Sequence, residues 1–90
     1  MKISENFVLR QVADTWVVLP LKTDTVDFNS MVRLNNSGAM LWKHLEQGAS
    51  REELIRALTG RYNVPQEQAA QDVDEFIETL KQIGCLVSIP

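Results

Sequence analysis

The sequence predicts an α+β fold of the winged helix-turn-helix type, in which a three-stranded antiparallel sheet is followed by three helices. Three observations predict it. Short runs of β-branched and aromatic residues occupy the front of the chain, helix-capping residues precede the later segments, and the last segment carries a long apolar stripe. A chain of 90 residues suits one core, so we expect a single domain over residues 1–90.

The first two strands are predicted to form a hairpin. Side chains alternate in direction along Phe7–Val12, and Ala13–Thr15 provides a tight turn. The run Trp16–Leu19 is rich in β-branched and aromatic residues, as strands are, and Pro20 ends it.

A third short strand is predicted at Met31–Leu34, after a polar loop over Lys22–Ser30. Met31 and Arg33 would point to one side of it, and Val32 and Leu34 to the other. If this strand lies at the sheet edge, its unpaired backbone groups can accept an extended peptide as an added strand. The alternative is an edge covered by the preceding loop or by a second copy of the chain, as a homodimer.

Capping residues mark the first two helices. Asn35–Ser37 offers N-cap side chains for the first, and Gly48 is a natural stop. Ser50 and Glu53 form a capping box that opens the second helix, which ends near Tyr62.

The third helix gives the clearest periodic signal. Pro65 suits its first turn, Gly84 suits its C-terminal stop, and Cys85–Ile89 is either a last short strand or a packed tail. Its apolar residues fall on one face at steps of three and four: Ala69, Val73, Phe76, Ile77, Leu80 and Ile83.

The charge pattern argues against nucleic acid as a partner. The net charge is −3, and the arginines of the second helix, at steps of five residues, scatter around its axis instead of forming a basic stripe. The third helix sets five acidic residues against Lys81: Glu67, Asp72, Asp74, Glu75 and Glu78. Such a run is usually a solvent-exposed helix face. The more specific alternative is an acidic surface that attracts a basic peptide.

No motif predicts catalysis, a metal site or a cofactor. His44 and Cys85 are the only residues of their types, and a metal site needs several matched ligands. The neighbours of Cys85 are apolar, which favours a buried thiol over a nucleophile. No apolar run is long enough to cross a membrane, and the first residues do not resemble a signal peptide, so a cytoplasmic protein is expected.

Several segments together resemble the PqqD family, named for a pyrroloquinoline quinone biosynthesis protein. The resemblance extends from about Phe7 to Leu86, and its most specific part is the stretch Leu34–Trp42 followed by the pattern Asp72-Val73 and Phe76. Further matching residues are Leu45, Gly48, Glu53, Leu54, Leu58, Tyr62, Leu80, Gly84, Cys85 and Leu86.

The resemblance implies a non-catalytic domain that binds the leader of a ribosomally made precursor peptide as an extra strand. The domain presents this peptide to a modifying enzyme, often a radical S-adenosylmethionine enzyme. Carried over, the binding edge is Met31, Val32, Arg33 and Leu34, and the helix wall includes Ala70, Val73, Asp74 and Ile77.

Other readings stay open at this stage. The Lys22–Ser30 connection is longer than in quinone-pathway members, which favours another peptide pathway. A winged-helix transcription regulator, an enzyme that uses Cys85 or His44, and a structural subunit are the competing functions.

Overall fold

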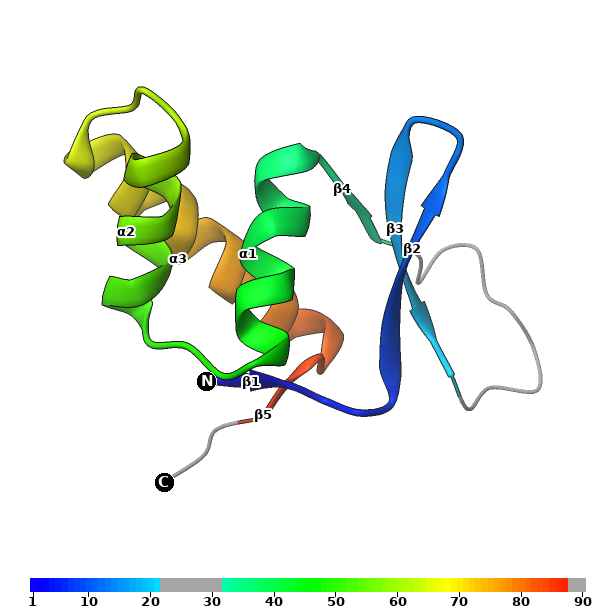
Figure 1. Cartoon of the computed structure of the whole chain (residues 1–90). Coiled ribbons are helices and arrows are strands. Elements are labelled where there is room, and N and C mark those ends of the chain that lie inside the picture. The colour runs from blue at the N-terminus through cyan, green and yellow to red at the C-terminus, as the bar shows by residue number, and fades with distance from the viewer. Residues whose placement is uncertain (22–31, 88–90) are drawn as a thin grey trace.

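The computed structural model describes residues 1–21 and 32–87, and Figure 1 shows its sheet and helices side by side. Strands β2 (Phe7–Val12), β3 (Thr15–Pro20) and β4 (Val32–Leu34) form a three-stranded antiparallel sheet in the order β2-β3-β4. The predicted sheet is confirmed. The Lys22–Ser30 loop and Met31 lie outside the described residues.

The hairpin turn is tighter than expected, because Thr15 already belongs to β3 and pairs with Val12. The turn therefore consists of Ala13 and Asp14, and Ala13 has a positive φ of 54°. Two-residue hairpin turns often need such a left-handed residue to match the strand twist.

The three predicted helices are α1 (Asn36–Glu46), α2 (Arg51–Arg61) and α3 (Gln66–Ile83). The side chain of Asn35 caps α1 by accepting a hydrogen bond from the Gly38 amide at 2.8 Å. The Ser50 hydroxyl caps α2 by accepting from the Glu53 amide at 3.2 Å.

The ends of α3 show one difference from the sequence prediction. Pro65 is the N-cap residue and not part of the first turn, because its ψ of 150° is extended and the helix begins one residue later. Gly84 ends α3 in the left-handed conformation, with a φ of 85°, as a C-terminal glycine does.

Two further strands, β1 (Lys2–Ile3) and β5 (Leu86–Val87), pair antiparallel and bring the two ends of the described chain together. β1 was not expected, because two residues are too few for an alternation pattern. The terminal amino group of Met1 donates to the Ala49 carbonyl at 2.9 Å, so the β1 segment also contacts the α1–α2 connection.

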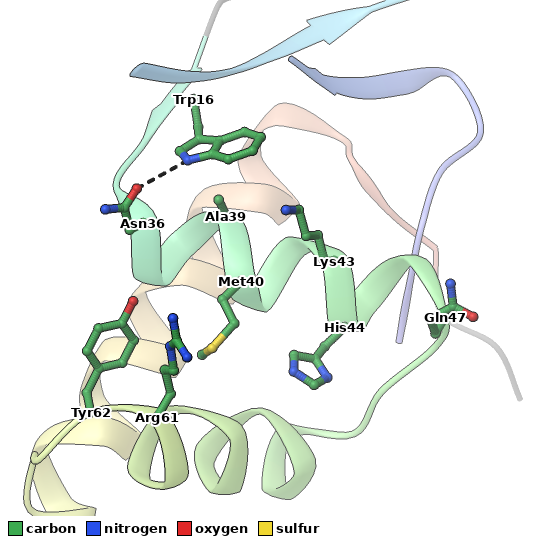
Figure 2. Close-up of a pocket in the computed structure, with 9 residues that line it drawn as sticks. All are labelled: Trp16, Asn36, Ala39, Met40, Lys43, His44, Gln47, Arg61 and Tyr62. Carbon is green, nitrogen blue, oxygen red and sulfur yellow. Dashed lines mark hydrogen bonds between the residues drawn. The ribbon is translucent and has the colours of Figure 1, made fainter. Parts of the chain in front are cut away.

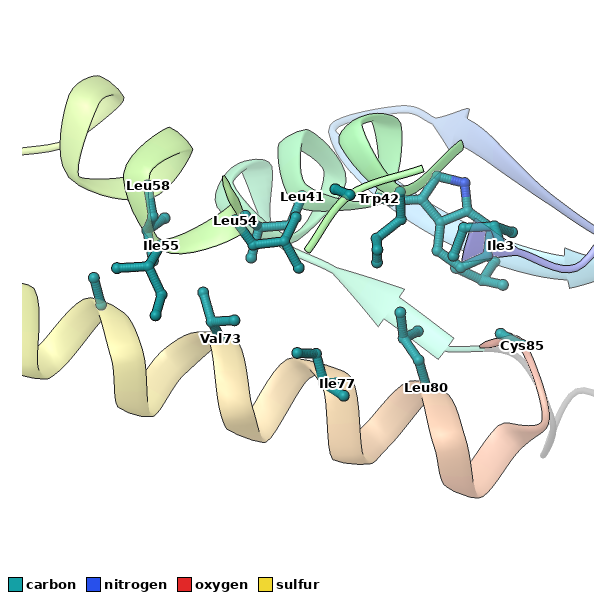
Figure 3. Close-up of a cluster of buried hydrophobic side chains, with 14 residues drawn as sticks. Ile3, Leu41, Trp42, Leu54, Ile55, Leu58, Val73, Ile77, Leu80 and Cys85 are labelled. Atoms are coloured by element: carbon teal, nitrogen blue, oxygen red, sulfur yellow. The ribbon is translucent and has the colours of Figure 1, made fainter. Parts of the chain in front are cut away.

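One hydrophobic cluster lies between the helices and reaches the inner face of the sheet (Figure 3). Its largest fully buried side chain is Trp42 of α1, and Leu54 and Leu80 bring α2 and α3 against it. Val18 is the fully buried residue from the sheet, and Ile3 joins the cluster from β1. Among residues 1–21 and 32–87, no helix combines the length and apolar character needed to cross a membrane.

Candidate functional site

β4 lies at one end of the sheet, hydrogen bonded to β3 and to no other strand of the described chain. Within residues 1–21 and 32–87, no backbone hydrogen bond outside the β3 ladder reaches Val32, Arg33 or Leu34. Successive strand residues point their N–H and C=O groups to alternate edges. The outer edge of β4 therefore offers backbone groups for another strand.

The side chains of β4 divide between the two faces of the sheet. Val32 and Leu34 pack against the hydrophobic core, whereas Arg33 is exposed on the opposite face. Arg33 lies directly across from Val17, whose other cross-strand neighbour is Arg10. Two arginines thus occupy one cross-strand row on the outer face of the sheet.

A cavity of about 290 Å³ adjoins the end of β4 and separates the start of α1 from α3. Asn35, the residue directly after β4, lines this cavity, and Phe76 is its aromatic lining residue. The full set of lining residues is Asn35, Ser37, Gly38, Leu41, Leu58, Asp72, Glu75, Phe76 and Thr79. We call the outer edge of β4 together with this cavity the β4–α3 groove.

Gly38 allows β4 and α1 to meet closely beside this cavity. A Cβ atom at Gly38 would lie 3.2 Å from Asn35 Oδ1 and 3.3 Å from Leu34 Cβ, closer than ordinary van der Waals contact. The absence of a side chain therefore lets the first turn of α1 pack on Leu34 while Asn35 caps the helix.

The four α3 residues named from the sequence lie away from this cavity. Val73 and Ile77 are 0% and 8% exposed and belong to the core, and Ala70 is partly buried against it. Asp74 is exposed, and its carboxylate accepts two hydrogen bonds from Arg51 of α2, at 2.6 and 3.0 Å. Their role in peptide binding stays a prediction, and the structure gives them packing and helix-pairing contacts.

The ion pair between Arg51 and Asp74 joins α2 to α3. The hydrogen bond from the guanidinium lowers the pKa of Asp74, and the same contact raises the pKa of Arg51. Both side chains are about half exposed, at 44% and 54%, so solvent screening keeps the contribution of the pair to stability small.

The cavity is instead lined on the α3 side by Glu75 and by three residues on one flank of the buried row, Asp72, Phe76 and Thr79. At about 100° per residue, these three lie about 55° to 115° around the helix from the centre of the buried row, whereas Ala70 and Asp74 lie on its other side. Phe76 lies at the edge of the apolar stripe and is only partly buried, and the sequence alone does not separate it from the core residues of that stripe. The apolar pattern identifies the stripe but not which flank faces β4.

The two side chains considered for catalysis differ in burial. Cys85 is 0% exposed, and burial raises the pKa of its thiol to about 11, so it is protonated at neutral pH. This confirms the prediction of a buried thiol. His44 is exposed on α1, and no group of three or more His, Cys, Asp or Glu residues in the described ranges is arranged to hold a metal ion.

One family model and two solved structures match this chain. The sequence model of a family described as coenzyme PQQ synthesis protein D (PqqD) matches residues 15–86. The solved structure of TbiB1 in complex with the TbiA(beta) leader peptide is 29% identical, with a TM-score of 0.78 over 100% of this chain and 99% of that chain. Lasso peptide synthetase B1 complexed with the leader peptide is 21% identical, with a TM-score of 0.75 over 97% and 96%, and shows the same fold. No curated protein matches this chain in sequence.

Proposed function

Because this chain belongs to the PqqD family, we propose that it is a non-catalytic peptide-recognition protein that forms a single domain. It binds the leader of a ribosomally made precursor peptide as an added strand along β4, and it presents that peptide to a modifying enzyme. A radical S-adenosylmethionine enzyme is the expected type of partner, and a cytoplasmic location is part of the proposal.

The observation that carries the proposal is the outer edge of β4, with which no other strand of residues 1–21 and 32–87 pairs, beside a side-chain cavity. Strand addition needs both features, because backbone hydrogen bonds provide affinity and pockets for alternate side chains provide specificity. The β4–α3 groove combines them. The likeness to TbiB1, which was solved with a leader peptide, supports the same use of this fold.

The groove suggests an alternating leader sequence. Side chains of an added strand point alternately to the two faces of the sheet. Those on the inner face would enter the cavity, where Phe76 and Leu41 favour apolar groups and Asp72 and Glu75 favour basic ones. Those on the outer face would lie beside Arg33, which favours an acidic group.

The family and the similar solved structures give no support to the alternative of a DNA-binding regulator. The acidic residues of α3 at the cavity, Asp72 and Glu75, would repel phosphate groups. The choice between the quinone pathway and another peptide pathway, and a homodimer through β4, stay predictions.

The test starts with capture of peptides from the lysate of the source cell on immobilised protein, followed by mass spectrometry. The retained peptide is then synthesised and titrated by fluorescence anisotropy. Thr79→Arg fills the cavity from an exposed position of α3, and we expect it to raise the Kd at least about tenfold.

Gln71→Arg is the matched control, because it adds the same charge at an exposed α3 position that does not line the cavity. Retention of DNA without any peptide, or equal peptide affinity for both variants, would contradict the proposed groove.

A further inference from the structure

A second, larger cavity of about 800 Å³ lies on the outer face of α1, between the sheet and the end of α2. We call it the α1 trough. Figure 2 shows Trp16 of β3 above α1, and Arg61 and Tyr62 below it, with Met40 and Lys43 projecting from the helix between them. The trough thus has an aromatic side chain on each side and a helix as its floor.

The trough differs from the β4–α3 groove in charge. Its lining includes Lys43 and Arg61 and no carboxylate, whereas Asp72 and Glu75 line the groove cavity. In the described part of the chain, neither Lys43 nor Arg61 forms an ion pair. In a protein of net charge −3, this is a cationic hollow whose two cations have no carboxylate partner among the described residues.

Trp16 is held in place by two contacts. Its indole N–H donates to Asn36 Oδ1 at 3.2 Å, and the ammonium of Lys43 lies 4.6 Å from the ring centroid. The ring is therefore fixed over the first turns of α1, and the cation is positioned at the edge of an apolar surface.

A third cavity of about 380 Å³ connects the two sites around the start of α1. It shares Asn36 and Tyr62 with the trough, and the residues that it shares with the groove are Asn35, Ser37, Leu58 and Asp72. On the helix, the groove residues of α1 and the trough residues of α1 lie about 140° apart at about 100° per residue. The hollows therefore form a belt around the N-terminal end of the helix.

We infer that the bound precursor peptide continues past β4 along this belt and places an acidic residue in the α1 trough, beside Lys43 and Arg61. The inference rests on the proposed function. The peptide leaves β4 at the Leu34 end, beside Asn35, where the belt begins. It then crosses the start of α1 between Asn36 and Tyr62.

The length of this path sets the spacing in the peptide. Lys43 lies about 10 Å along α1 from Asn36 at about 1.5 Å per residue, and the path also turns around the helix. A distance of about 15 Å takes about four or five residues of extended chain at about 3.3 Å each. The acidic residue of the peptide is therefore expected about four or five residues before or after the β4-paired stretch.

The experiment titrates two synthetic forms of the captured peptide against the full-length protein. The long form includes the flanking acidic residue, and the short form ends with the β4-paired stretch. The double variant Lys43→Gln/Arg61→Gln should weaken the long form by about three- to tenfold and leave the short form unchanged. Replacing the acidic residue of the long form by its amide should produce the same loss in the wild-type protein.

The control is Arg56→Gln/Lys81→Gln, which removes the same charge from exposed residues outside the trough. Equal affinity of the long form for wild type and the trough variant would overturn the inference, even if the variant no longer binds the modifying enzyme or another partner. In that case the groove variant Thr79→Arg still tests the proposed function separately. Failure of both peptide forms to bind the wild-type protein overturns the proposed function and this extension together.

Discussion

Gly38 and Gly60 show how the same residue type has different roles in two helices. A Cβ at Gly38 would press on Asn35 and Leu34, whereas a Cβ at Gly60 of α2 meets nothing within 4 Å. Gly38 is therefore required by the junction between β4 and α1. Gly60 has no such contact and only weakens its helix.

We expect Gly60→Ala to raise the free energy of unfolding by about 0.5 kcal/mol, because alanine has the higher helix propensity. Gly38→Ala should lack this gain, since its new methyl group must displace the Asn35 cap or Leu34. Urea denaturation of both variants tests the pair. Equal stabilisation by the two substitutions would contradict the close approach at the junction.

Cys85 is a packing residue whose thiol reports on the fold. It is fully buried, and burial raises its pKa to about 11, so both access and thiolate formation are suppressed near neutral pH. We expect a disulfide reagent at pH 8 to label it slowly in the native protein and rapidly in denaturant. Fast, stoichiometric labelling of the native protein would show that this part of the core is open.

At the scale of the element, β4 is the strand along which we propose that the leader pairs. Its three described residues have N–H groups that point alternately to β3 and to the outer edge. One of the substitutions Val32→Pro and Arg33→Pro therefore removes an outward N–H, and the other removes a group on the β3 side.

We expect the outward substitution to leave the circular dichroism spectrum and Tm nearly unchanged and to raise the leader Kd at least about tenfold. The inward substitution should lower the Tm, because it breaks the ladder with β3. Two folded variants that both retain wild-type leader affinity would exclude backbone pairing at β4.

The α3 helix shows how far the sequence predicts the site. Its apolar period correctly predicted the buried row that contains Val73, Ile77 and Leu80. Period alone gives no information on which flank turns toward β4, because that depends on how α3 crosses the sheet. Phe76 and Asp74 are therefore equally eligible in sequence, and only packing places Phe76 at the cavity and Asp74 against Arg51.

At the scale of the whole molecule, short contacts between distant segments complete the fold. The capping residues and apolar runs predicted the sheet and the three helices. A last short strand was one of the two alternatives predicted for Cys85–Ile89, and β5 agrees with it. Its pairing with β1 was not predictable, because each strand has two residues and the pairing joins opposite ends of the chain. The position of β1 is set by tertiary packing, because Ile3 is 7% exposed and belongs to the same hydrophobic cluster as Trp42 and Leu80.

This contact should matter for global stability. We expect Ile3→Ala to lower the free energy of unfolding by about 2–4 kcal/mol, in the range for truncating a buried isoleucine. Lys2→Ala changes an exposed neighbour in the same strand and should stay within about 0.5 kcal/mol of wild type. Equal stability of the two variants would mean that β1 does not support the core.

Strand addition at β4 is the claim that the account depends on most, and the sheet provides its own control. β2 is the other end strand of the same sheet and also has a cavity beside it, of about 370 Å³, so it is the competing edge for the peptide. The direct measurement is backbone NMR of the isotopically labelled protein with the captured leader peptide at saturation. We expect cross-strand contacts between peptide backbone and Val32–Leu34, with slower hydrogen exchange of the outward β4 amides and no change at Phe7–Val12. Peptide contacts along β2, or saturation that leaves the β4 amides unchanged, would contradict the account.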